Sequence, residues 1–87
     1  MNTTASYDVT GYNVSEVVEV NIKRIGGKYV GRFEDWPNIA LLVPKRHYLD
    51  KIIPALIQAL YLQAGERVHV RHMGSRVTAA CKAQTTP

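Results

Sequence analysis

Cysteine and long apolar runs are scarce in this 87-residue chain. Cys81 is the single cysteine, which excludes a disulfide within the chain and a site of four thiolates. The longest apolar stretch, residues 52–62, is too short and too interrupted to span a bilayer. Residues 1–16 contain no Lys or Arg and no apolar run, so they do not resemble a secretory signal. We therefore expect a cytoplasmic protein that does not associate with membranes.

The composition is that of a small globular chain. Apolar residues make up 46% and charged residues 21%, so the chain has enough apolar side chains for one modest core. A domain of this size often gains stability by association, which is compatible with a homodimer. The net charge of +4 indicates either attraction to nucleic acid or an acidic protein, or simply an ordinary basic surface.

Periodicity divides the chain into three parts. Residues 1–15 are rich in Thr, Ser and Asn without an evident repeat, and residues 74–87 are small and polar. Segments of this composition at chain ends are usually poorly ordered. We therefore expect a flexible leader over 1–15, a single α+β domain over 16–73 and a flexible tail over 74–87.

Three strands are predicted in the first half of that domain. Strict alternation over 18–23 indicates a half-buried strand, and Gly26–Gly27 suits a tight hairpin to a second strand over 28–33. The continuous apolar run 39–43, bounded by prolines, is typical of a central strand covered on both sides. The three strands together predict an antiparallel meander.

One amphipathic helix follows within residues 45–65. Its predicted buried stripe, at helical spacing, is Ile53, Leu56, Ile57 and Leu60, extended by Leu49 and Ile52. Pro54 leaves two possible starts, because the helix can begin at the proline or begin near His47 and be distorted there. We favour the earlier start.

A fourth strand is predicted after Gly65. Val68 and Val70 alternate with Arg67, His69 and Arg71, so the valines should point inward. The predicted fold class is thus α+β: a three-stranded antiparallel meander, a helix packed on the sheet and a fourth strand at an edge, in the order β-β-β-α-β.

Residues for catalysis or metal binding are not found in a usable pattern. His69 and His72 are three residues apart on a strand and should face opposite sides, so they cannot share an ion. No nucleophile-elbow motif is present, and Glu34–Asp35 is the only adjacent acidic pair. We expect no catalytic residues, no metal site and no cofactor, and therefore not an enzyme.

Basic residues support a nucleic-acid hypothesis. Residues that could together form a basic face of the sheet are Lys23, Arg32, Arg67, His69 and Arg71. The aromatic residues Tyr29, Phe33 and Tyr61 could stack on bases if exposed, but they fall at inward positions, which are typical of packing rather than of base stacking. An ordinary basic surface remains the alternative.

The corner Glu34–Asn38 contains the only tryptophan. Trp36 lies beside Pro37 and two acidic residues, an arrangement typical of interface anchors. The alternative is that Trp36 closes the end of the core. Sheet edges offer a second route to a partner, by strand addition.

The segments GGKYVGRFEDWPNIALLV (26–43) and HYLDKIIPALIQAL (47–60) resemble HicB-like antitoxin domains and their stand-alone relatives of uncharacterised function. The similarity covers about residues 18–72. It implies a partly degenerate ribonuclease-H-like architecture that is often dimeric, binds a small ribonuclease toxin and blocks its active site. Full antitoxins of this kind also carry a C-terminal DNA-binding region.

The chain departs from that family pattern in three places. Asn38 stands where Gly is usual, and Asn also accepts a left-handed φ. The basic stretch 44–47 replaces an acidic one, although an inhibitor of a basic surface should be acidic there. Residues 74–87 are too few for an added DNA-binding module, so we expect none.

Taken together, these features predict a small, non-catalytic protein-interaction module that binds and inhibits a partner stoichiometrically. The predicted contact residues are Glu34, Asp35, Trp36, Pro37 and Asn38. The alternatives are a nucleic-acid-binding protein that uses the basic strand face, or an accessory inhibitor of a host complex encoded by a phage or mobile element.

Overall fold

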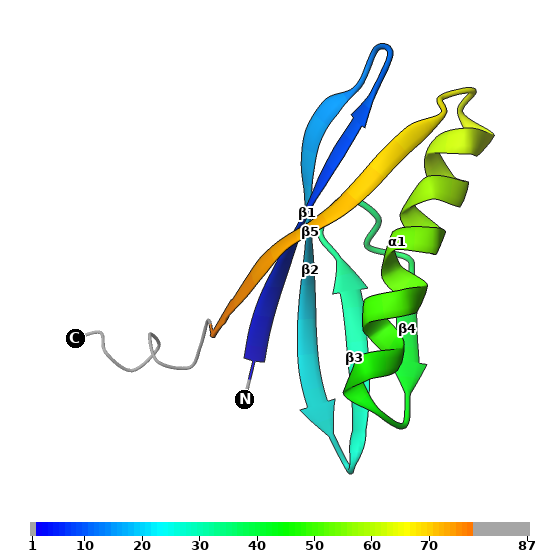
Figure 1. The fold of residues 1–87 in the computed structure, drawn as a ribbon. Helices are drawn as coiled ribbons and strands as arrows, with labels where there is room; N and C mark the ends of the chain where they lie inside the picture. Colours follow the sequence, from blue (N-terminus) through cyan, green and yellow to red (C-terminus); the bar gives the residue numbers. More distant parts are fainter. Residues whose placement is uncertain (1, 78–87) are drawn as a thin grey trace.

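The computed structural model of the chain describes residues 2–77 as an α+β fold with one five-stranded antiparallel sheet and one helix. The strands lie in the order β4-β3-β2-β1-β5, and α1 lies along one face of the sheet (Figure 1). The element bounds are β1 Asn2–Gly11, β2 Ser15–Ile25, β3 Lys28–Phe33, β4 Ala40–Val43, α1 Arg46–Gln63 and β5 Val68–Val77. Within residues 2–77 no element covers the opposite face, which we call the open face.

The expectation of a flexible leader over residues 1–15 was wrong, because residues 2–11 form β1. This strand lies inside the sheet, paired with β2 on one side and β5 on the other. Its helix-facing side chains Ala5, Tyr7 and Val9 are fully buried. Polar residues alternate with them on the open face. The segment is therefore polar on average, although its apolar residues recur with the period of two that is typical of a strand.

The meander β2-β3-β4 is confirmed, with one correction. Gly26 and Gly27 have φ of 58° and 80°, the left-handed conformation that a tight hairpin between β2 and β3 requires. The strand β4, however, is an edge strand and not a central one. Its Leu42 is 64% exposed on the open face, while Val43 is buried beneath the helix.

The helix α1 begins at Arg46 and continues through Pro54, as the earlier of the two starts predicted. Its fully buried residues are Leu49, Ile53 and Ile57, whereas Ile52 is 39% exposed. Leu49 packs over Gly31 of β3, where a Cβ atom would be in ordinary van der Waals contact with Leu49 Cδ2, at 3.5 Å.

The strand β5 follows the helix and returns to the sheet edge beside β1. Val68 and Val70 face the helix side, as predicted, but the strand extends to Val77 and so includes residues expected in the tail. The pairing with β1 shifts register between Ser6 and Tyr7. No helix among residues 2–77 has the length and apolarity needed to cross a membrane.

Candidate functional site

A hollow of about 590 Å³ lies at the C-terminal end of α1. We call it the acidic hollow. Its walls come from the start of β2, the loop between β3 and β4, and the last turns of the helix. The lining residues are Glu16, Val17, Asp35, Trp36, Leu60, Tyr61 and Ala64.

Trp36 is held in this hollow by two edge-to-face aromatic contacts. Its ring lies 5.9 Å from that of Phe33 and 5.8 Å from that of Tyr61, measured between centroids. The side chain is only partly buried, so it closes the end of the core and also presents a surface to solvent. The two interpretations of Trp36 are therefore compatible.

Backbone hydrogen bonds fix both ends of the loop that carries Trp36. The Glu34 N–H donates to the carbonyl of Glu19 on β2 over 3.1 Å, and the Ile39 N–H donates to the carbonyl of Trp36 over 3.0 Å. The loop is thus tied to the sheet on one side and folded into a turn on the other. A fixed loop reduces the entropy lost when a partner binds.

Tyr61 shows that the hollow is electrostatically negative. Its hydroxyl donates a hydrogen bond to Oε1 of Glu16. Burial, the hydrogen bond to Glu16 and the charges of Glu16 and Asp35 together raise the pKa of Tyr61 to about 12, with burial as the largest cause. Two carboxylates therefore act on one phenol from opposite walls of the hollow.

The helix adds to this negative potential. The carbonyl end of a helix carries a partial negative charge, which basic side chains in the last turn commonly neutralise. The last turn of α1 contains no basic residue. The acidic hollow therefore combines aromatic rings, two carboxylates and a helix C-terminus, an arrangement suited to a cationic side chain.

The predicted corner Glu34–Asn38 is divided between two surfaces. Asp35 and Trp36 line the acidic hollow, whereas Glu34 lines a separate depression on the open face. Pro37 and Asn38 are exposed and line neither. Asn38, which stands where the family has Gly, does not use the left-handed backbone that Asn tolerates, because among residues 2–77 only glycines have a positive φ.

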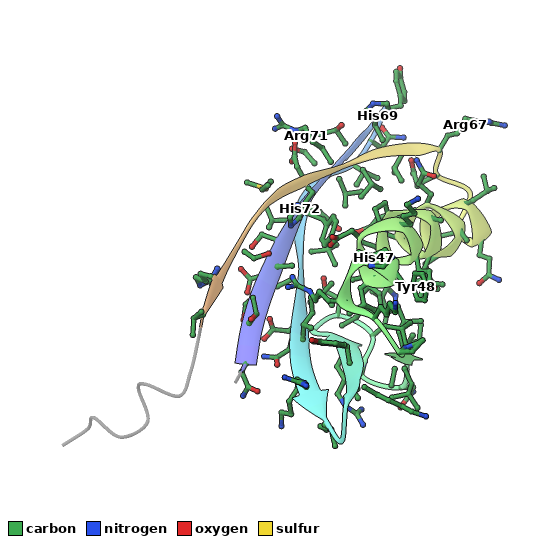
Figure 2. All side chains as sticks on the ribbon, turned by 60° about the horizontal axis from the view of Figure 1, so that its bottom comes forward. His47, Tyr48, Arg67, His69, Arg71 and His72 are labelled. Carbon is green, nitrogen blue, oxygen red and sulfur yellow. The ribbon has the colours of Figure 1, made fainter. Side chains whose placement is uncertain are left out.

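Most of the predicted basic residues share the open face. The strand pairings place Lys23, Arg32, His69 and Arg71 on it. Arg67 is separate, since it lies beside the helix residues Gln58 and Leu62. Figure 2 shows Arg67 at the end of the chain segment that leaves the helix, with His69 and Arg71 farther along β5.

The open face also contains Arg76, which the sequence predicted to lie in the flexible tail. Arg76 pairs in register with Thr4, Thr4 with Asn21, and Asn21 with Arg32. These four residues form one row across β5, β1, β2 and β3, with an arginine at each end of the row. Acidic side chains partly neutralise this face. Arg71 lies 3.3 Å from Asp8, and Arg76 lies 3.7 Å from Glu19.

The histidines do not form a site. His69 lies on the open face and His72 on the helix side, where its ring is 4.9 Å from that of Tyr7, so the expected opposite orientation is confirmed. Among residues 2–77 no group of three or more His, Cys, Asp or Glu side chains is placed to hold a metal ion. Cys81 lies outside the described residues.

Glu16 and Tyr61 are the residues of the hollow that sequence reasoning missed. Glu16 falls in phase with Val18 and Val20, so continuing the alternation two residues earlier would have placed it on the helix side. Tyr61 offered no comparable signal. Comparison of the chain with models of known families, with curated proteins and with solved structures gave no match.

Proposed function

We propose that this protein is a non-catalytic module that binds a partner protein stoichiometrically through the acidic hollow. The observation that carries this proposal is the position of Trp36. Its ring is fixed between Phe33 and Tyr61 and is still partly exposed, between two carboxylates. Partly exposed, rigidly held tryptophans are the residues that most often dominate binding energy at interfaces.

The chemistry of the hollow favours a basic segment of the partner. A Lys or Arg side chain entering it would lie against the rings of Trp36 and Tyr61 and near the carboxylates of Glu16 and Asp35. Contacts between cations and aromatic rings contribute most when the cation is desolvated. Opposite charge on the two surfaces would also increase the rate of association.

Inhibition of a small ribonuclease is one form that this function can take. The resemblance to HicB-like antitoxin domains implies such a partner, and a protein that binds RNA presents a basic surface. The basic stretch 44–47 does not complement such a surface, but the acidic hollow at the other end of α1 does. An accessory inhibitor of a host complex would use the same hollow with a different basic partner.

Capture from a nuclease-treated native lysate, followed by titration of the recovered partner, tests the proposal. Trp36→Ala should weaken binding by about 2 kcal/mol or more. Asp35→Lys reverses a charge on an exposed side chain and should also weaken binding strongly, without removing the aromatic packing. Tyr12→Ala is the matched control, because Tyr12 is an aromatic residue that is 96% exposed and does not line the hollow.

The proposal requires a clear separation between these variants. Equal binding by Asp35→Lys and the unmodified protein would contradict it, as would a decrease with Tyr12→Ala as large as that with Trp36→Ala. Trp36→Phe keeps an aromatic ring against Phe33 and should retain more binding than Trp36→Ala.

Nucleic-acid binding by the open face is the second candidate. The row that joins Arg32 to Arg76 favours it, with Lys23 close by on β2. Neutralisation of phosphate groups would be its main source of affinity, so binding should weaken steeply as salt concentration rises. An oligonucleotide titrated at several salt concentrations tests this candidate.

A double variant, Lys23→Ala with Arg32→Ala, should lower oligonucleotide affinity. It should also reduce the magnitude of the salt slope by roughly 0.9 for each phosphate group that the protein no longer neutralises. Arg67→Ala serves as the control, because Arg67 lies apart beside the helix. An unchanged slope in the double variant would exclude Lys23 and Arg32 as phosphate contacts, and with them the row that favours this candidate.

A further inference from the structure

A cavity of about 270 Å³ lies at the opposite end of α1, beneath its first turn. We call it the arginine cavity. It is lined by Thr3, Ile22, Arg24, Tyr29 and Arg46. Register explains how the sheet residues meet there, since Thr3 pairs with Ile22 and Arg24 pairs with Tyr29 on the helix side. Arg46, the first residue of α1, closes the cavity from the helix.

Arg46 has an unused hydrogen-bond donor at this cavity. Its Nε atom is buried within the protein and has no hydrogen-bond partner among the described residues, so the terminal nitrogens of the guanidinium group are the donors available to a ligand in the cavity. Leaving a buried N–H group without an acceptor costs free energy. Most buried N–H groups in folded proteins therefore have a hydrogen-bond partner. Within residues 2–77, neither Arg46 nor Arg24 forms an ion pair with a carboxylate.

The surroundings leave these two positive charges uncompensated. The first turn of α1 contains no acidic residue, and Lys45 before it provides no side-chain hydrogen bond to the free N–H groups of the helix. Asp50, four residues farther along α1, acts on Tyr7 together with Arg46, but it is not within ion-pair distance of Arg46. The arginine cavity therefore combines two guanidinium groups with two hydroxyl-bearing residues.

We propose that the arginine cavity binds a small phosphate monoester. The fork of N–H donors on an arginine matches the oxygen atoms of a phosphate, and two arginines with Thr3 and Tyr29 offer more donors than a two-oxygen carboxylate can accept. The buried side chain of Ile22 and the ring of Tyr29 form an apolar wall beside these donors. That wall suits the organic part of an ester. The site is separate from the acidic hollow and does not depend on the function proposed there.

Isothermal titration with phenyl phosphate, at constant ionic strength in chloride, tests this proposal. We expect saturable binding that is tighter than that of inorganic phosphate, because the phenyl group contacts the apolar wall. Benzoate, which has the same ring and a carboxylate, should bind at least about ten-fold more weakly than phenyl phosphate. Dimethyl phosphate, a diester with a single negative charge, should also bind more weakly, which distinguishes a monoester from a nucleic-acid backbone.

Variants connect the binding to the cavity. Arg24→Gln and Arg46→Gln should each weaken phenyl phosphate binding by about ten-fold or more, which is the effect expected for one charge-assisted hydrogen bond. Arg67→Gln removes the same charge from an exposed arginine at the other end of the helix and should change affinity less than two-fold, about the effect of a distant screened charge. Arg24 is an exposed strand residue, so Arg24→Gln decides the matter even if Arg46→Gln does not fold.

Several results would overturn the proposal. Absence of saturable phenyl phosphate binding by the unmodified protein would do so. So would equal affinities for benzoate or dimethyl phosphate and phenyl phosphate, or equal decreases in affinity in Arg24→Gln and Arg67→Gln.

Discussion

The two ends of α1 carry opposite charges, and each is the reverse of the charge that stabilises a helix. The helix begins with Lys45 and Arg46 and has no acidic residue in its first turn, while no basic residue lies in its last turn. Glu16 and Asp35 face its C-terminal end instead. Acidic groups near the start and basic groups near the end would each contribute about 0.3–1 kcal/mol. The charges at both ends of α1 therefore do not contribute to helix stability.

The strand β2 also has opposite charges at its two ends. The helix side of β2 runs from Glu16 through the buried residues Val18, Val20 and Ile22 to Arg24. The acid therefore lies at the hollow and the base at the cavity, with an apolar core between them. The same strand positions both sites, and the core separates two surfaces of different chemistry.

The largest expected effect is a decrease in the stability of the helix, which both sites share. Ile53→Ala removes a fully buried side chain from the middle of α1 and should lower the free energy of unfolding by about 2–5 kcal/mol. Urea denaturation measures this change. Ile52→Ala is the matched control, since its side chain is 39% exposed and should cost much less. Equal costs for the two variants would mean that burial does not hold the helix in place.

The sequence predicted the parts of the fold in which apolar residues alternate visibly. The meander, the helix with its early start and the inward valines of β5 follow from period and turn chemistry. The strand β1 was missed because Thr, Ser and Asn dilute its pattern, although Ala5, Tyr7 and Val9 keep strict alternation. Moderately polar strands at a chain end resemble loops in composition, and only tertiary pairing distinguishes them.

Only part of the candidate site was predicted from the sequence, because some of its residues lie far apart in the chain. Trp36 and Asp35 stood out locally, but their partners Glu16 and Tyr61 are far away in the sequence. The arginine cavity was not visible at all, because Thr3, Arg24 and Arg46 come from three separate elements. Contacts between distant segments depend on strand order, which local patterns do not specify.

Reversing the charge at the start of the helix should separate stability from binding. Arg46→Glu places an acid in the first turn and should stabilise the helix by about 0.3–1 kcal/mol, measured by thermal unfolding. The same variant should lose phenyl phosphate binding. A decrease in stability would indicate instead that Arg46 stabilises the fold. The charge at the start of the helix would then not be unfavourable to stability, in contradiction to the comparison of the two ends.

The corresponding change at the other end should be smaller, because the hollow is open to solvent. Gln63→Lys places a cation in the last turn of α1 and should add a few tenths of a kcal/mol, roughly, to stability. Ala64→Lys places the cation within the hollow itself and should also weaken binding of a basic partner. If Gln63→Lys weakens the partner as much as Ala64→Lys does, the general charge of this end matters rather than the hollow.

The smallest effect concerns two tyrosines that report the charge at each end. Burial and the charge of Asp50 raise the pKa of Tyr7 to about 12, against the opposing effect of the Arg46 charge, which lowers it. Burial and two carboxylates raise the pKa of Tyr61 to about 12. Removing a charge by substitution should therefore move the two pKa values in opposite directions: Glu16→Gln should lower that of Tyr61, and Arg46→Gln should raise that of Tyr7.

Phenolate absorbance during an alkaline titration measures both values, and Tyr61→Phe identifies the step that belongs to Tyr61. Because the folded state holds the proton of Tyr61 more tightly than the unfolded state, its contribution to stability is present below pH 10 and is lost as the pH rises to about 12. Glu16→Gln should make this loss smaller, because the pKa of Tyr61 would then lie closer to its ordinary value. A Tyr61 pKa unaffected by Glu16→Gln would mean that Glu16 does not act on Tyr61, and the acidic hollow would then lack half of the negative charge on which its proposed selectivity for a basic partner depends.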